Sequence, residues 1–171
     1  MLDPVRDWTD GEIITSFNAL AEKLINLKKE NQKKFRLIFR FDPDSENIET
    51  VFNEVLRLAF HFKNLQVVID EIQLFSSPHF LPNYLKNLLF IGRHHGISLV
   101  CITQRPGQLN KSILAQSLHV FVGQLHEKND LRVISDFIFL PPEKIINLPK
   151  GRFFHFSPGE KIQEIEIFRK K

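Results

Sequence analysis

Two short apolar runs constrain this chain most, because each is too short for a helix and each ends abruptly in polar residues. Residues 65–69 continue into Asp70 and Glu71, and residues 97–102 continue into Thr103 and Gln104. Short runs rich in Val, Ile and Leu are typical of strands buried on both faces, as in a parallel sheet under helices. Ligands of such sheets bind at the carboxyl ends of the strands. We therefore expect both polar ends to lie together at one functional edge.

Segments with helical spacing alternate with strands through residue 139, which predicts right-handed βαβ units and a mostly parallel sheet flanked by helices. Asp3-Pro4 indicates the end of a strand at the N-terminus, and residues 151–168 resemble a hairpin that extends or caps one edge. The predicted strands are residues 35–41, 65–70, 97–103 and 119–125. The predicted helices are residues 9 or 10 to 29 (with Ile13 and Ile14 in the apolar stripe), a helix capped by Asp44 or Ser45, one ending near Gly92, 112–118 and 130–139.

Length and composition fit one α/β domain over residues 1–171 in a reducing compartment. The chain has an ordinary charged fraction of 25%, and Cys101 is its only cysteine. It has no apolar stretch near the roughly 20 residues that span a bilayer, so we predict a cytoplasmic protein with no membrane span. The net charge of +3 is compatible with DNA as a partner, but the basic residues are dispersed.

The acids after the first run suit nucleotide hydrolysis. A carboxylate at a strand tip, here Asp70, can hold Mg²⁺ through its waters, and a second one, Glu71, can orient or deprotonate the attacking water. Strands also end in acids simply because they reach solvent. The second run strengthens the hydrolytic interpretation, since Thr103 and Gln104 supply a hydroxyl and an amide for a γ-phosphate or a water.

Two arginines are candidates for stabilising the transition state, namely Arg93 and Arg105. Arg93 is equally well explained as a surface residue that meets the dipole at a helix end. The adjacent His94 and His95 have no third ligand at metal-binding spacing, so we interpret them as ordinary surface residues.

In three places the chain resembles the HerA–FtsK-type P-loop ATPases. Residues IDE (69–71) and GRHHGISLVCITQRP (92–106) are similar to the Walker B strand and the sensor strand of that family, and LDPVRDW (2–8) is similar to the segment after its second strand. The family consists of ring-forming, often hexameric motors that include DNA translocases and viral or plasmid DNA-packaging ATPases. Phage filament-assembly ATPases of the zonula occludens toxin-like group share the same two strands.

The resemblance implies a role for each polar residue and two cofactors, ATP and Mg²⁺. Asp70 would be the magnesium-side carboxylate, Glu71 the catalytic base and Gln104 the sensor, with Thr103 beside the nucleotide. Arg93, or alternatively Arg105, would reach the nucleotide of a neighbouring subunit in a homo-oligomeric ring.

One family motif is absent from these 171 residues. A phosphate-binding loop needs GxxxxGK[ST], and none of the seven glycines is followed by lysine. In the family, that loop and its strand precede the LDP segment, and the strand lies between those predicted at 97–103 and 119–125. We therefore expect an N-terminally incomplete domain, with the motif encoded roughly 20–30 residues upstream. A late-started gene model, an excised fragment and a degenerate relative all remain open.

Three functions follow, in order of preference. The first is the C-terminal part of a motor ATPase that couples ATP hydrolysis to DNA translocation or packaging, of viral or plasmid origin and inactive in this form. The alternative is a non-catalytic P-loop remnant that acts as an interaction or scaffold module. A different α/β enzyme ranks last, because the chain has neither a Gly-rich cofactor loop nor a G-x-S-x-G elbow.

Overall fold

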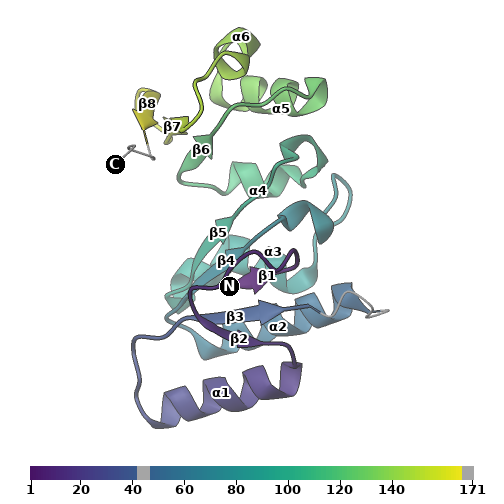
Figure 1. Cartoon of the computed structure of the whole chain (residues 1–171), viewed down its shortest axis with the longest axis vertical. Helices are drawn as coiled ribbons and strands as arrows, with labels where there is room; N and C mark the ends of the chain where they lie inside the picture. The colour runs from purple at the N-terminus through teal and green to yellow at the C-terminus, as the bar shows by residue number, and fades with distance from the viewer. Residues whose placement is uncertain (42–46, 167–171) are drawn as a thin grey trace. The chain divides into compact units, whose positions relative to one another are not determined.

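The computed structural model describes residues 1–41 and 47–166, which form two compact units (Figure 1). The N-terminal unit ends at Gln104 and the C-terminal unit begins at Arg105.

The N-terminal unit is built on a parallel sheet with the strand order β2-β3-β1-β4-β5. The predicted parallel sheet flanked by helices is therefore confirmed. Its strands are β1 (Leu2–Asp3), β2 (Glu12–Ile14), β3 (Leu37–Arg40), β4 (Gln66–Ile69) and β5 (Ser98–Cys101). Its helices are α1 (Phe17–Lys29), α2 (Ile48–Phe62) and α3 (Asn83–Ile91), with 3-10 turns η1 (Ile72–Leu74) and η2 (Gly92–His95).

The first strand in the chain takes the middle of this sheet. Although β1 has only two residues, it pairs with β3 on one side and β4 on the other. The backbone N–H of Phe39 donates to the Met1 carbonyl at 2.7 Å, and that of Asp70 donates to the Leu2 carbonyl at 3.1 Å. The predicted strand end at the N-terminus is confirmed, and it joins the two halves of the sheet.

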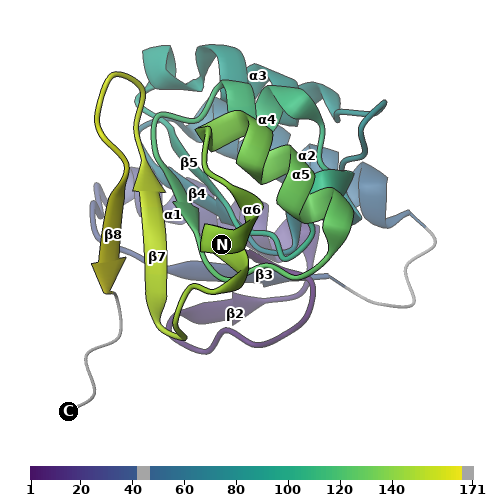
Figure 2. The same cartoon turned by 90° about the horizontal axis from the view of Figure 1, so that it is seen from above.

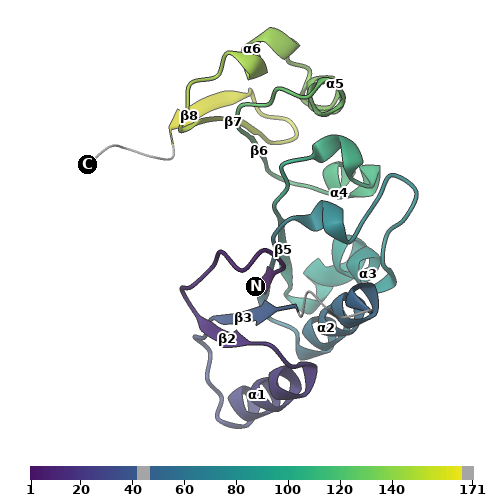
Figure 3. The same ribbon diagram turned by 45° about the vertical axis from the view of Figure 1, so that its right-hand side comes forward.

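Helices α2 and α3 lie side by side on one face of the sheet (Figure 3). The core next to α2 is rich in aromatic rings, because Phe52 of α2 stacks on Phe75, which follows η1, with ring centroids 4.0 Å apart, and both side chains are fully buried. Phe41, after β3, lies 5.1 Å from the Phe75 ring and extends the same cluster. Several of the 17 phenylalanines thus form the core between the sheet and these helices.

The prediction of one helix from residue 9 or 10 to 29 is wrong at its start. Residues 12–14 form β2 instead, and pairing with β3 buries Ile14 while leaving Ile13 45% exposed. This alternation has the period of a strand. Gly11 permits the pairing, because a Cβ there would stand 3.1 Å from the Arg36 carbonyl oxygen. Helix α1 starts only after Ser16, whose hydroxyl accepts from the Ala19 N–H.

The later boundaries of the N-terminal unit agree with the predictions to within a few residues. The predicted caps at Asp44 and Ser45 lie outside the described residues, and α2 follows Asn47 as its cap. The α3 segment continues through η2 and ends at Gly96, which has a φ of 69° in the left-handed region. There is no room for a side chain at Gly96, since a Cβ would stand 2.2 Å from the Asn64 amide oxygen.

The C-terminal unit is a small antiparallel sheet covered by helices. The hairpin of β7 and β8 is visible in Figure 2, and β6 pairs antiparallel with β7. Its elements are η3 (Pro106–Gln108), α4 (Lys111–Ala115), β6 (Val120–Val122), α5 (Lys128–Ile138), α6 (Pro142–Ile146), β7 (Arg152–Phe156) and β8 (Gln163–Glu166). Its core consists of Val122, Leu131, Ile134, Ile138, Ile145, Leu148 and Phe154.

The prediction that residues 119–125 continue the parallel sheet is wrong. Val120 pairs with Phe156 and Val122 with Phe154, so β6 belongs to the sheet of the hairpin. The reason is the shared apolar face, because these residues all contribute to the core beneath α5 and α6. Among the described strands, β5 pairs only with β4 and β6 only with β7, so each is an edge strand of its own sheet.

Within the described ranges, no helix combines the length and apolarity needed to cross a membrane.

We predict that Phe52→Ala lowers the free energy of unfolding by about 3–5 kcal/mol, because it leaves a cavity against the ring of Phe75. Phe90→Ala is the matched control, since that side chain is 42% exposed on α3. We expect the control to cost less than about 1 kcal/mol. Urea denaturation followed by circular dichroism measures both, and equal effects would contradict this account of the core.

Candidate functional site

The carboxyl ends of β4 and β5 meet, as predicted from the two apolar runs. The strands are in register with Ile69 opposite Cys101, and the pairing continues one step further. The Ile102 N–H donates to the Ile69 carbonyl at 2.9 Å, and the Ile72 N–H donates to the Ile102 carbonyl at 3.0 Å. These two bonds hold the segment after β4 against the segment after β5, and so bring their polar side chains together.

Glu71 is the centre of a small hydrogen-bond network at this edge. The Gln104 amide donates from Nε2 to Glu71 Oε1 at 2.7 Å, and the Gln73 amide donates from Nε2 to Glu71 Oε2. Thr103 Oγ1 then donates to Gln73 Oε1 at 2.6 Å. Of the side chains predicted for the site, Gln104 therefore contacts Glu71 directly, and Thr103 is linked to Glu71 through Gln73. Each Glu71 oxygen accepts one amide N–H and keeps a second lone pair.

Sequence reasoning did not identify Gln73. The residue lies in η1, two positions after Glu71, and its amide links Glu71 to Thr103 through both of its polar ends. An amide side chain closely following a pair of acids was the available signal. It was uninformative without the turn, since residues two apart in a helix do not face each other, and in a strand they lie on one face but one full pleat apart.

Glu71 has an unusual backbone, with φ 46° and ψ 49° in the left-handed region. For an L-residue other than glycine this conformation costs roughly 1–2 kcal/mol. The sharp turn ends the strand, starts η1 and directs the Glu71 side chain toward Gln104. A strained residue that supports three polar contacts is a common feature of functional sites.

Asp70 lies beside this network and is mostly buried, with 8% of its surface exposed. Its Oδ1 accepts the Glu71 backbone N–H at 3.0 Å, and its Oδ2 accepts the indole N–H of Trp8 at 2.7 Å. The two carboxylates are therefore held by different partners. Carboxylate oxygens are the ligands that Mg²⁺ prefers, and it commonly keeps several of its waters. The donor set at the tip of β4 fits such an ion bound through Asp70.

Trp8 is held in place by a buried ion pair. Asp3, which is fully buried, accepts the backbone N–H groups of Asp7 and Trp8 at 3.2 Å each. The Arg40 guanidinium donates to Asp3 Oδ2 at 3.3 Å and to the Trp8 carbonyl at 2.6 Å. These contacts fix the segment between β1 and β2 against β3, which places the Trp8 indole at the carboxyl edge.

The structure does not bring Arg93 to this edge. Arg93 lies in η2, where the neighbouring His95 carbonyl accepts from the Asn64 N–H just before β4. In a parallel pair this is the amino end of the strands. Arg93 is thus separated from Gln104 by at least the four residues of β5, or about 13 Å. Its side chain is exposed, and it is not positioned to act on the Glu71 of its own chain.

Arg105 belongs to the C-terminal unit and is engaged there. Its Nε lies 3.0 Å from Asp130 Oδ2 and its guanidinium 3.9 Å from Glu127. Asp130 is 2% exposed and also accepts the Gly107 N–H at 2.7 Å. Backbone hydrogen bonds from Asp130 and Asn129 lower the pKa of Glu127, which keeps it charged beside Arg105. These contacts give Arg105 a structural role at the start of α5.

The histidines and the cysteine carry no metal site. The His95 ring packs edge-on against Phe60, with centroids 4.6 Å apart. In the part of the chain that the structure describes, no three or more His, Cys, Asp and Glu side chains gather as direct ligands of a metal ion, so an ion at Asp70 would be held through its waters. Burial raises the pKa of the Cys101 thiol to about 12, so it is unreactive at neutral pH.

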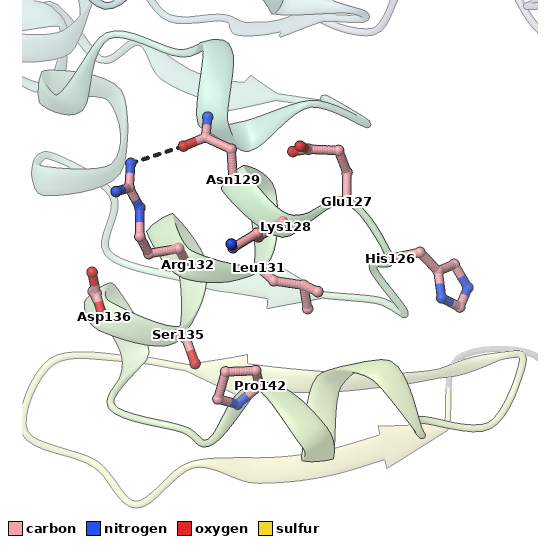
Figure 4. Close-up of a pocket in the computed structure, with 9 residues that line it drawn as sticks. All are labelled: His126, Glu127, Lys128, Asn129, Leu131, Arg132, Ser135, Asp136 and Pro142. Atoms are coloured by element: carbon pink, nitrogen blue, oxygen red, sulfur yellow. Dashed lines mark hydrogen bonds between the residues drawn. The ribbon is translucent and has the colours of Figure 1, made fainter.

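A pocket of 610 Å³ lies in the C-terminal unit along α5 (Figure 4). Its lining mixes charges of both signs with Pro142, and Arg132 donates to the Asn129 side chain at 2.9 Å. None of the four polar residues at the ends of β4 and β5, which are Asp70, Glu71, Thr103 and Gln104, lines this pocket. The hydrogen-bonded cluster around Glu71 is therefore the better candidate for chemistry.

We predict that the conformation of Glu71 reverses the usual order of two substitutions. Glu71→Gly and Glu71→Ala both remove the carboxylate and its bonds, but only glycine adopts a positive φ freely. Glu71→Gly should therefore be more stable than Glu71→Ala by about 1–2 kcal/mol. The matched pair at Glu22, exposed within α1, should show alanine more stable by about 1 kcal/mol. Urea unfolding compares the four variants, and the same order at both positions would contradict the strain.

Comparisons with known proteins give two weak sequence relatives, and no family model matches. Protein P9 of Pseudoalteromonas phage PM2 is 27% identical over 137 residues, which are 75% of this chain and 60% of the relative. The probable helicase MJECL08 of Methanocaldococcus jannaschii is 26% identical over 92 residues, 52% of this chain and 18% of the relative. The chain thus spans less than two thirds of either protein.

Among solved structures, the chain is similar to the genome packaging NTPase B204 of Sulfolobus turreted icosahedral virus 2. The B204 complex with AMPPCP has a TM-score of 0.75 and 19% identity, covering 98% of this chain and 81% of B204. The complex with ATP-gammaS has a TM-score of 0.73 and 18% identity, covering 95% and 78%. The two proteins share a fold over nearly the whole chain.

Proposed function

We propose that this chain is the C-terminal part of a P-loop motor ATPase that couples ATP hydrolysis to the translocation or packaging of DNA. The observation that carries the proposal is the hydrogen bond from Gln104 to Glu71, because it joins the tips of two adjacent strands and sets an amide on the carboxylate that would activate the attacking water. The fold shared with a genome packaging NTPase that binds ATP analogues supports it. We propose DNA as the substrate that is moved because of that likeness and because one of the sequence relatives is a probable helicase.

Each polar residue at the carboxyl edge would have a separate role in hydrolysis. Bound Mg²⁺ would neutralise charge on the phosphates, and Asp70 would hold it through its water shell. Glu71 would accept the proton of the attacking water at a carboxylate oxygen. The Gln104 amide, fixed on that carboxylate, would orient the same water or contact the γ-phosphate, with the Thr103 hydroxyl beside it. Gln73 would keep Glu71 in position.

Hydrolysis also needs a phosphate-binding loop, and we propose that residues other than these 171 supply it. Positioning of the γ-phosphate supplies most of the catalysis in this class of reaction. We therefore expect no ATP hydrolysis by this chain alone. The scaffold alternative, a non-catalytic remnant, rests on the same absence of GxxxxGK[ST] and predicts that the acids have no measurable role.

Mg-ATP binding to this chain, followed by calorimetry with Asp70→Ala as control, is the first test. We expect the wild type and Asp70→Ala to show no difference in Mg-ATP binding, because the amides and the lysine of a phosphate-binding loop are absent. Asp70-dependent binding would contradict the need for an outside loop.

The second test uses the longest polypeptide whose reading frame contains this chain. There, Glu71→Gln should slow DNA-stimulated ATP hydrolysis at least a hundredfold while nucleotide binding persists. An unchanged rate would favour the scaffold alternative.

We propose Arg93 as the arginine that acts on a neighbouring subunit of a homo-oligomeric ring. It is exposed, it lies at the opposite end of β5 from Glu71, and Arg105 is held by Asp130. A group that cannot reach its own site can still complete the site of the next subunit. Such arginines contribute about 10³- to 10⁵-fold to hydrolysis.

Mixed rings test this assignment in the longer polypeptide. Rings made only of Arg93→Ala or only of Glu71→Gln subunits should both be inactive. An equal mixture should recover roughly a quarter of the wild-type rate, because half the sites keep Glu71 and half of those face a subunit with Arg93. His94→Ala is the matched control and should leave the rate unchanged. A mixture that stays inactive would contradict action between subunits.

A further inference from the structure

The segment between β1 and β2 places one aromatic side chain on the candidate magnesium carboxylate. We propose that Trp8 is a positioning residue, whose indole N–H fixes the orientation in which Asp70 meets a divalent cation. The inference rests on the proposed function of Asp70 and deepens it. It is carried by the bond from Trp8 Nε1 to Asp70 Oδ2 at 2.7 Å.

The hydrogen bonds to Asp70 hold its carboxylate in one orientation. Oδ1 accepts the Glu71 backbone N–H at 3.0 Å while Oδ2 accepts the indole, so rotation about the Cβ–Cγ bond would break both bonds. A carboxylate has about four acceptor positions, and two remain for waters or a cation. Donors that hold a metal-binding carboxylate are themselves important, and their loss typically weakens metal binding or activity about 10- to 100-fold.

The support for Trp8 is itself rigid. Asp3 accepts the backbone N–H of Trp8 and of Asp7, and Arg40 bridges Asp3 and the Trp8 carbonyl. Asp3 is fully buried, and a buried carboxylate without such partners would be strongly destabilised. The bonds between β3 and the segment after β1 thus determine where the indole stands.

Packing alone does not explain a tryptophan at this position. The ring is 41% exposed, whereas a tryptophan retained for its apolar surface is usually largely buried. What distinguishes the side chain here is its donor, which reaches a carboxylate that is 8% exposed. Phenylalanine would keep an aromatic ring at this position and lack that N–H.

The chain provides a direct readout, because Trp8 is its only tryptophan. The indole N–H therefore gives a single indole signal in a ¹H–¹⁵N NMR spectrum. Asp70→Asn keeps an acceptor but removes the charge, so it should shift that signal away from its wild-type position. Mn²⁺ is the probe for the cation site, since its unpaired electrons broaden the signals of nearby protons and its free concentration is measured by electron paramagnetic resonance.

The experiment measures the Mn²⁺ affinity of the full chain for the wild type, Trp8→Phe, Asp70→Ala and the double variant. We expect micromolar Mn²⁺ to broaden the wild-type indole signal selectively, and Trp8→Phe to weaken Mn²⁺ binding about tenfold or more. The same substitution in the Asp70→Ala background should have no further effect, because Trp8 acts through Asp70. Phe90→Leu, an exposed aromatic change on α3, is the matched control and should bind Mn²⁺ like the wild type.

Two other outcomes are decisive. If the wild type binds Mn²⁺ through Asp70 and Trp8→Phe binds it within twofold of the wild type, the positioning role is wrong while the proposed cation site stands. If the wild-type affinity does not depend on Asp70, the cation site and the role of Trp8 are both wrong. Loss of folding in Trp8→Phe is recognised from the remaining amide signals. In that case Asp70→Asn decides, since an unmoved indole signal would overturn the hydrogen bond.

Discussion

The pairing of β1 with both of its neighbours is the interaction on which the N-terminal unit depends. Two residues supply the hydrogen bonds that join β3 to β4, so the sheet is continuous only because the first residues of the chain are inserted into it. The same insertion buries Asp3, and Asp3 in turn holds the segment that carries Trp8. Sheet formation and the geometry around Asp70 are therefore consequences of one small element.

The topology of the sheet separates residues that lie together at the carboxyl edge from one that does not. Asp70, Glu71 and Gln104 meet because parallel strands in register end at the same level. Arg93 precedes β5 and so lies at the other end of the strand. The distance between them is a property of the topology, and a change of side-chain rotamer cannot remove it. An assembly in which one chain presents Arg93 to another resolves the separation without any movement inside the unit.

Much of the parallel sheet and of the candidate site could be predicted from the sequence, because the informative segments were apolar runs bounded by polar residues. The parallel pairing of β4 and β5 and the meeting of their polar ends followed from that pattern. The failures occurred where a pattern was ambiguous. Ile13 and Ile14 fit a helical stripe as well as a strand, and only the close approach of Gly11 to β3 distinguishes the two. Residues 120–122 form a strand as expected, but its partner depended on the distant Phe154 and Phe156. The contributions of Gln73 and Trp8 needed coordinates, because each depends on a turn that brings a side chain back to the edge.

The left-handed backbone of Glu71 has an evolutionary consequence. A residue other than glycine or asparagine at such a position is maintained against a standing preference for replacement, because glycine removes the strain. Selection for proton transfer opposes that preference, and selection for a scaffold does not. In a lineage that abandoned hydrolysis, this position would drift toward glycine or asparagine while the buried residues around it stayed apolar. A glutamate that persists here across divergent relatives would therefore indicate selection for its carboxylate.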